Sequence, residues 1–246
     1  MFNRSSFLGR SISIFVFVVL IAALSYASGA QGLKPKIRFS EDYWYFGYLP
    51  VNAVVHHDFW IHNSGGDTLK ISKVTPGCGC TTAPLSKQDI APNDSARLSV
   101  VFDTKNMFGK MIKDVTIKSN DPDKLETQVT FMGVLNSEHP KVKVKPNVVR
   151  FFPSAANNNR MQKTLLVSNE FDTDIELKAI DYPRLLVKIA PVSVKVKARS
   201  SVSIEVEQTV AATAEEDALG SITFEFTGLE NERTTVPLVT YYKRKP

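Results

Sequence analysis

The sequence predicts an all-β protein with two tandem immunoglobulin-like β-sandwich domains after an N-terminal signal peptide. Three observations lead to this prediction. Apolar and polar residues alternate with period two, turn residues separate the alternating runs, and similar segments recur in the same order about a hundred residues apart. No long stretch combines helical spacing with helix caps.

The alternation is clearest in four runs rich in Val, Ile, Phe and Thr, namely residues 98–102, 116–118, 202–206 and 222–226. In a strand this pattern places every second side chain on the same face of the sheet. Turn residues such as Asn, Gly, Pro and Asp cluster between the runs, for example at 63–67. Short strands separated by turns indicate a sandwich rather than βαβ units.

The chain also repeats itself. Residues 59–63 lead to 69–71 in the first half, and residues 165–169 lead to 175–177 in the second half. Further segments recur downstream in matching order, which two copies of one strand-rich module explain better than one large fold.

We expect a signal peptide at residues 1–30 and two domains at 31–136 and 141–246. The boundary falls in a polar stretch that contains His139. Each copy has about 100 residues, a size that suits a seven- or eight-stranded sandwich.

The first thirty residues predict export. Arg4 and Arg10 precede an apolar run at 12–24, and small residues follow this run. This is the layout of a signal peptide, with cleavage expected after Ala30 or Ala27. We therefore expect the protein in the periplasm or at the cell surface of a bacterium.

A single-pass membrane anchor is the alternative interpretation of this segment. The apolar run is shorter than the roughly 20 residues that cross a bilayer, so we prefer a cleaved signal peptide. No cysteine lies near the cleavage site, which argues against a lipoprotein anchor. No other segment approaches that length, so we expect no membrane span in the mature chain.

Charge argues against nucleic acid as a partner. Loss of the signal peptide removes two arginines and no acidic residue, which lowers the formal net charge from +5 to +3. The Lys residues at 141–145 alternate with Val, which in a strand places them on the solvent face rather than in a basic patch.

Cys78 and Cys80 are the only cysteines, and three interpretations remain open for them. An extended strand would hold their Cα atoms about 6.6 Å apart, near the upper end of the disulfide range. Gly79 can adopt a positive φ and tighten the bend, so we expect a bridge to be possible but strained and easily reduced. Alternatively, the thiols are simply buried small side chains, or they bind a soft metal ion.

The metal hypothesis requires further ligands, because two thiolates do not complete a Cu(I) or Zn(II) site. If the chain turns back after residues 63–67, the cysteines return toward the start of the preceding strand. His57 or His56 would then be the third ligand and His62 would not, with His57 facing the core. No other cofactor is expected.

The ordered segments resemble the bacterial family called domain of unknown function 1573, over about residues 39–135. The resemblance rests on residues 59–65, 69–71, 78–81, 90–93, 100–103 and 119–121. It implies an exported bacterial protein with an immunoglobulin-like sandwich, similar to major-sperm-protein and ciliary ASH interaction domains. The family signature maps onto Cys78, Gly79, Cys80 and Thr81, whereas Asn93 stands where the family often has Gly. No established activity comes with the family.

The sequence contains none of the nucleophile, zinc-protease or phosphate-binding motifs that mark common enzymes. We therefore expect a non-enzymatic binding or scaffold protein whose partner is a protein or another cell-envelope component. The alternative is a thiol–disulfide or soft-metal protein that uses the Cys-Gly-Cys motif. Trp44 and Trp60 are candidates for a partner surface, and exposed aromatic residues also suit carbohydrate or cell-wall binding.

Overall fold

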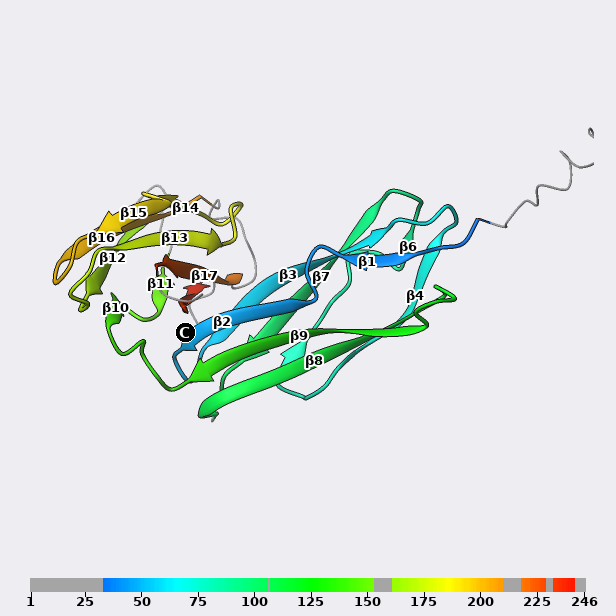
Figure 1. Cartoon of the computed structure of the whole chain (residues 1–246), viewed down its shortest axis with the longest axis horizontal. Helices are drawn as coiled ribbons and strands as arrows, with labels where there is room; N and C mark the ends of the chain where they lie inside the picture. The colour runs from blue at the N-terminus through cyan, green and yellow to red at the C-terminus, as the bar shows by residue number, and fades with distance from the viewer. Residues whose placement is uncertain (1–32, 106, 153–160, 210–217, 229–231, 242–246) are drawn as a thin grey trace, which may run out of the picture. The chain divides into compact units, whose positions relative to one another are not determined.

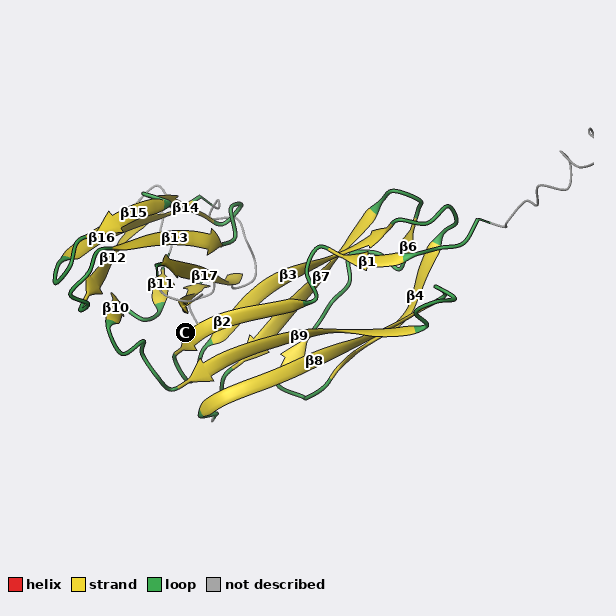
Figure 2. Ribbon diagram, viewed as in Figure 1, coloured by secondary structure: helices red, strands yellow, loops and turns green. Residues whose placement is uncertain are grey.

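The computed structural model describes residues 33–105, 107–152, 161–209, 218–228 and 232–241 (Figure 1). All regular secondary structure in these ranges is strand and none is helix, as Figure 2 shows. The all-β prediction is therefore confirmed. The predicted signal peptide lies outside the described residues.

Among the described residues, nine strands lie in the part of the chain that precedes the predicted boundary. They are β1 (Ile37–Phe39), β2 (Tyr43–Leu49), β3 (Val54–Asn63), β4 (Leu69–Pro76), β5 (Thr81–Thr82), β6 (Asp89–Ile90), β7 (Ser95–Asp103), β8 (Gly109–Ser119) and β9 (Glu126–Leu135). We call this part the first half.

Nine more strands follow in the described ranges after the boundary, and we call this part the second half. They are β10 (Val142–Lys145), β11 (Val149–Phe151), β12 (Gln162–Asn169), β13 (Ile175–Asp181), β14 (Val187–Ala190), β15 (Ser193–Val196), β16 (Ser201–Gln208), β17 (Ala218–Thr227) and β18 (Glu232–Thr240). Each half exceeds the expected seven or eight strands because short strands such as β5 and β6 add to the count.

The two halves share one strand order. One sheet of the first half runs β1-β3-β7-β5, and its equivalent in the second half runs β10-β12-β16-β14. The remaining strands run β6-β4-β8-β9-β2 and β15-β13-β17-β18, with β11 paired to β18. Each strand of the first half thus corresponds to the strand nine places later. The placement of β1, β3, β7 and β5 opposite β4, β8 and β9 is that of an immunoglobulin-like sandwich.

Each half buries its own cluster of apolar side chains, as alternating strands dictate. Phe59 and Ile61 point into the first cluster with no exposed surface, as expected from their alternation with polar neighbours. Phe224 and Phe226 fill the second cluster in the same way.

The halves are also joined to each other. Thr234 of β18 pairs with Tyr48 of β2, so one sheet continues from one half into the other. Residues 35–246 accordingly form one compact unit by their backbone contacts. The domain boundaries 31–136 and 141–246 therefore stay a prediction.

The connection at residues 63–67 crosses from one sheet to the other. β3 pairs with β1 and β7, whereas β4 pairs with β8 and β6. The expectation that the cysteines return toward the start of the histidine strand assumed that β3 and β4 are neighbours in one sheet, which they are not. The chain after β4 nevertheless returns level with the start of β3, one strand away, because Phe102 of β7 pairs with both Val55 of β3 and Thr81 of β5. Non-local pairing with β7 determines the neighbours of β3, and local alternation carries no information about such pairing.

Candidate functional site

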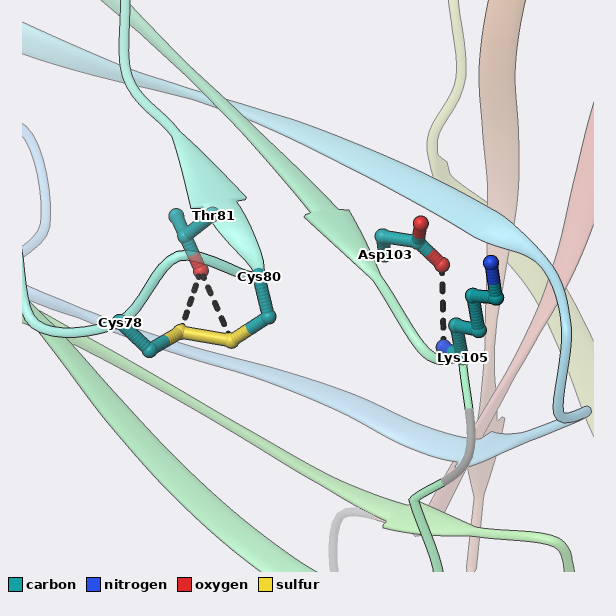
Figure 3. Close-up of a disulfide and its surroundings, with 5 residues drawn as sticks. All are labelled: Cys78, Cys80, Thr81, Asp103 and Lys105. Atoms are coloured by element: carbon teal, nitrogen blue, oxygen red, sulfur yellow. Dashed lines mark hydrogen bonds between the residues drawn. A yellow bond between two sulfur atoms is a disulfide. The ribbon is translucent and has the colours of Figure 1, made fainter.

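The structure joins Cys78 and Cys80 in a disulfide within the connection between β4 and β5 (Figure 3). Their Cα atoms are 5.2 Å apart, well inside the usual disulfide range. The chain is a turn here, in which the Thr81 N–H donates to the carbonyl of Cys78 at 3.4 Å. The expectation of a strained bridge assumed an extended strand, so the turn removes its basis. Gly79 does not adopt a positive φ.

Thr81 closes the disulfide turn from the core side. Its hydroxyl oxygen lies 3.4 Å from the sulfur of Cys78 and 3.8 Å from that of Cys80, as the dashed lines in Figure 3 show. Thr81 is buried and pairs with Phe102 of β7, while the Asp103 N–H donates to the Cys80 carbonyl at 2.9 Å. These bonds hold the turn against the edge of the sheet.

The opposite side of the turn is open. Gly79 is exposed, and a Cβ atom added there would meet no atom within 4 Å apart from those of its two chain neighbours. Cys78 and Cys80 are both partly exposed, but Cys80 packs against the first core cluster. Of the two cysteines, Cys78 is thus the one that does not pack against the core cluster.

His57 lies elsewhere, buried between carboxylates of both halves. Its Nδ1 is 2.7 Å from Asp181 and its Nε2 is 3.1 Å from Glu41, while its ring stacks on Trp44 with centroids 3.7 Å apart. Burial alone would lower the pKa of His57, but the hydrogen bonds and charges of Asp181 and Glu41 outweigh it, so the pKa is raised. The two carboxylates therefore favour the protonated form of the ring, which bridges the two halves.

These contacts leave the histidines unsuited to the proposed metal site. Both ring nitrogens of His57 face carboxylates, and Nε2 of His56 is 2.9 Å from Asp58. Within the described ranges, no group of three or more His, Cys, Asp or Glu side chains is arranged to hold a metal ion. The structure thus does not bring the histidines and the cysteines together.

The two tryptophans occupy opposite environments. Trp44 is only 6% exposed, and the guanidinium of Arg233 lies 4.8 Å from its ring, so its assignment to a partner surface is wrong. Trp60 of β3 is 42% exposed, so its assignment to a partner surface stays a prediction. The strand of Trp44 reads Tyr-Trp-Tyr-Phe-Gly-Tyr, and a run without charged residues does not reveal which face is buried.

Sequence reasoning missed a pocket of about 440 Å³. It is lined by His56, Asp58, Arg97, Ser99, Asp181, Tyr182, Pro183, Arg184, Leu185, Leu186, Leu219 and Ser221. We call it the junction pocket, because β3 and β7 of the first half supply one wall and the second half supplies the other. Leu185 is 87% exposed and Leu219 is 43% exposed, so its rim is apolar and open.

Charged groups of both signs surround this apolar rim. Burial by itself raises the pKa of Asp58, but hydrogen bonds from His56 and Ser99 and the charge of Arg97 outweigh it, so the pKa is lowered and Asp58 is ionised. Across the pocket, Arg184 lies over the ring of Tyr182 at 4.6 Å. The pocket can therefore accept an apolar side chain while it offers both donors and acceptors.

A fixed junction supports the pocket. The His56 N–H donates to the Ser221 hydroxyl at 3.1 Å, and that hydroxyl donates to the His56 carbonyl at 2.9 Å. Together with the bridge through His57, these bonds place the two walls without help from a ligand. A signal was present in the sequence, since residues 182–186 occupy the repeat position of the cysteine turn.

The described part of the chain has no helix of the length and apolar character that would cross a bilayer. Residues 37–135 match the family model described as "Protein of unknown function (DUF1573)", which confirms the resemblance drawn from the sequence. No curated protein sequence matches the chain significantly.

Several solved structures are similar. A protein of unknown function from Porphyromonas gingivalis W83 is 10% identical with a TM-score of 0.36, over 83% of this chain and 98% of that one. The periplasmic chaperone SfaE is 9% identical with a TM-score of 0.33, over 84% and 100%. The ASH / PapD-like domain 7 of human CEP192 is 8% identical with a TM-score of 0.35, over 43% and 89%. Likenesses this low carry no functional argument, and the assignment of the fold rests on the strand order.

Proposed function

From the premise that residues 37–135 belong to the DUF1573 family, we propose that this chain is an exported, non-enzymatic binding or scaffold protein of the bacterial cell envelope. Its partner is a protein, bound at the junction pocket. The observation that carries the proposal is the pocket itself, open to solvent and rimmed by the exposed side chains of Leu185 and Leu219.

The lining favours a polypeptide over a small polar ligand. Exposed leucines are unfavourable in water, and a partner side chain that covers them contributes about 25 cal/mol per Å² of buried apolar surface. Asp58, Arg97 and Arg184 stand around that apolar area and can pair with the amide and charged groups of a peptide. Interface sites typically combine an apolar centre with such a polar rim.

The strand that follows the pocket offers a second means of attachment. Leu186 leads directly into β14 (Val187–Ala190), which is the outermost strand of its sheet. An outermost strand can pair with an extended segment of a partner through backbone hydrogen bonds. A peptide could thus place a side chain in the pocket and continue along β14.

The proposal of a binding role is tested by one matched pair of variants. Leu185→Glu places a charge at the pocket rim, while Leu125→Glu places the same charge at another exposed leucine, in the β8–β9 turn. Both leucines are on the surface, so both variants should fold. Tagged mature protein is cross-linked in intact cells and its partners are identified by mass spectrometry.

We expect Leu185→Glu to reduce the yield of cross-linked partner at least tenfold, because a bound partner would bury the new carboxylate against apolar surface. Leu125→Glu should retain the wild-type yield. Equal yields from the three proteins would rule out the junction pocket as the binding site, and turnover of a substrate at this pocket would rule out its non-enzymatic role.

Export has its own test. Cell fractionation followed by N-terminal sequencing should find a mature chain outside the cytoplasm that begins after Ala27 or Ala30. An intact Met1 terminus in the cytoplasm would contradict this part of the proposal.

A further inference from the structure

We propose that the Cys78–Cys80 disulfide exchanges with protein dithiols, so that it acts as a redox site of this chain and not as a structural staple. The inference goes beyond the binding role, because it concerns a different loop and a chemical reaction. Four observations carry it: an internal comparison, the size of the closed loop, access to one sulfur, and the position of Thr81.

The second half provides the internal comparison. Residues 182–186 connect β13 to β14, as residues 77–80 connect β4 to β5, and they contain no cysteine. β14 nevertheless pairs with β16 in the manner in which β5 pairs with β7. The fold therefore does not need a disulfide at this position.

The size of the closed loop leads to the same conclusion. The two cysteines are separated by two positions in the sequence, so the bond closes a very short loop. A cross-link stabilises a protein mainly by restricting the unfolded chain, and the restriction grows with the length of the closed loop. This disulfide is thus poorly placed to serve stability.

Access selects the sulfur that reacts. Both cysteines are partly exposed beside Gly79, but Cys80 packs against the core cluster and Cys78 does not. An incoming thiolate can therefore reach Sγ of Cys78, with the sulfur of Cys80 as the leaving group. Thiol–disulfide exchange depends on such access and on how well the leaving thiolate is stabilised.

Thr81 is positioned to stabilise that leaving group. Its hydroxyl lies within hydrogen-bonding distance of both sulfurs and is held there by the pairing of Thr81 with Phe102. When the Cys80 sulfur becomes a thiolate, the same hydroxyl donates a charge-assisted hydrogen bond, which is stronger than the bond to a neutral sulfur.

The exchange balances with a protein dithiol as the only co-reactant. One partner thiolate attacks Sγ of Cys78, the Cys78–Cys80 bond breaks, and a mixed disulfide forms while Cys80 leaves as a thiolate. The second partner thiolate then attacks the partner's own sulfur in the mixed disulfide and releases Cys78. The partner is oxidised to a disulfide, the two cysteines gain two electrons, and the two protons of the dithiol pass to them. Reverse exchange with an oxidised partner restores the bond.

The experiment uses the full mature chain in its oxidised form and dithiothreitol as the probe. The protein is incubated with low reductant in native buffer, quenched with an alkylating agent and measured by intact mass, while far-ultraviolet circular dichroism follows the strands. We expect alkylation of both cysteines with an unchanged spectrum. If alkylation requires denaturant, or occurs only as the strand signal is lost, the disulfide is structural and the proposal fails.

Two substitutions of Thr81 test the leaving-group assignment. Thr81→Val keeps the shape without the hydroxyl and should slow reduction by about tenfold, while Thr81→Ser keeps the hydroxyl and should react at nearly the wild-type rate. A Thr81→Val variant that folds and reacts as fast as wild type would overturn the role of the hydroxyl. Leu185→Glu should exchange normally, so failure of this proposal is distinguishable from failure of the binding role.

Discussion

The two halves place different chemistry at the same point of one strand order. Between β4 and β5 the first half has the Cys-Gly-Cys turn, and between β13 and β14 the second half has Tyr182–Leu186 at the junction pocket. Both loops lead into the outermost strand of a sheet. The comparison teaches that the cores determine the strand order, while the connection between the sheets is free to carry a function.

What the halves do share is a buried asparagine at the preceding crossover. Asn63 donates to the carbonyls of Asp67 and Ile90, at 2.7 and 2.9 Å. Asn169 donates to the carbonyls of Thr173 and Val196, at 2.9 and 3.2 Å. Each asparagine also accepts from the backbone N–H two residues later, so each satisfies the loop that passes between the sheets.

The largest effect on stability is expected at these two asparagines, and it tests whether they contribute equally to the free energy of unfolding. Asn63→Ala and Asn169→Ala should each lower the free energy of unfolding by about 3 kcal/mol, because one buried and several part-buried backbone groups lose their partner. Urea denaturation of both variants measures this. Asn120→Ala removes bonds of the same kind at an exposed position, where water replaces them, and should cost less than about 1 kcal/mol. If only one of the two buried-asparagine variants lost stability, the two asparagines would not be equivalent.

The next effect compares two buried histidines with opposite pKa shifts. Because the folded-state pKa of His57 lies above its usual value of 6.5, its protonated ring stabilises the fold fully below about pH 6.5, and this contribution is lost as the pH rises through the raised pKa. His57→Gln should lose about 2 kcal/mol at pH 6 and flatten this part of the stability profile. Urea midpoints between pH 5 and 9 would show it, and an unchanged slope would contradict the bridge.

His139 should give the opposite dependence of stability on pH. Burial, with a smaller contribution from Lys143, lowers the pKa of His139 to about 4, and its Nδ1 accepts from the N–H groups of Lys141 and Val142. The neutral ring of His139 therefore stabilises the fold above pH 6.5, and this stabilisation is lost as the pH falls toward 4. His139→Gln should reduce the acid sensitivity of the wild type, and acid unfolding followed by fluorescence measures this.

The smallest effect concerns the disulfide. A cross-link that closes so short a loop should contribute about 1.5 kcal/mol at most. The double variant Cys78→Ser, Cys80→Ser should thus keep its fold and lose no more than that in urea denaturation. A loss of 4 kcal/mol or more would show that the first half needs a staple that the second half lacks.

The local sequence pattern was sufficient to predict the fold class and, in some strands, which side chains face the core. Alternation placed Phe59 and Ile61 in the core and His57 on the core side, and all three are buried. It was insufficient for Trp44, since the neighbouring residues are aromatic and do not mark a solvent face.

Contacts between segments that are distant in the sequence could not be predicted from such patterns. The partner of His57 is Asp181, which lies 124 positions away in the sequence, and the junction pocket unites residues of β3 and β7 with the loop after β13. Alternation specifies which way a side chain faces but not which strand lies beside it. The pairing of the whole chain was therefore needed to find the site.

The claim that the junction pocket binds a protein partner is tested most directly in the cell. A photo-reactive amino acid is placed at Leu185 and, as the control, at Leu125, and adducts are read after irradiation of intact bacteria. The account predicts one discrete protein adduct at position 185 that is absent at position 125. Identical adduct patterns at the two positions, or no adduct at 185 in a well-expressed protein, would contradict it.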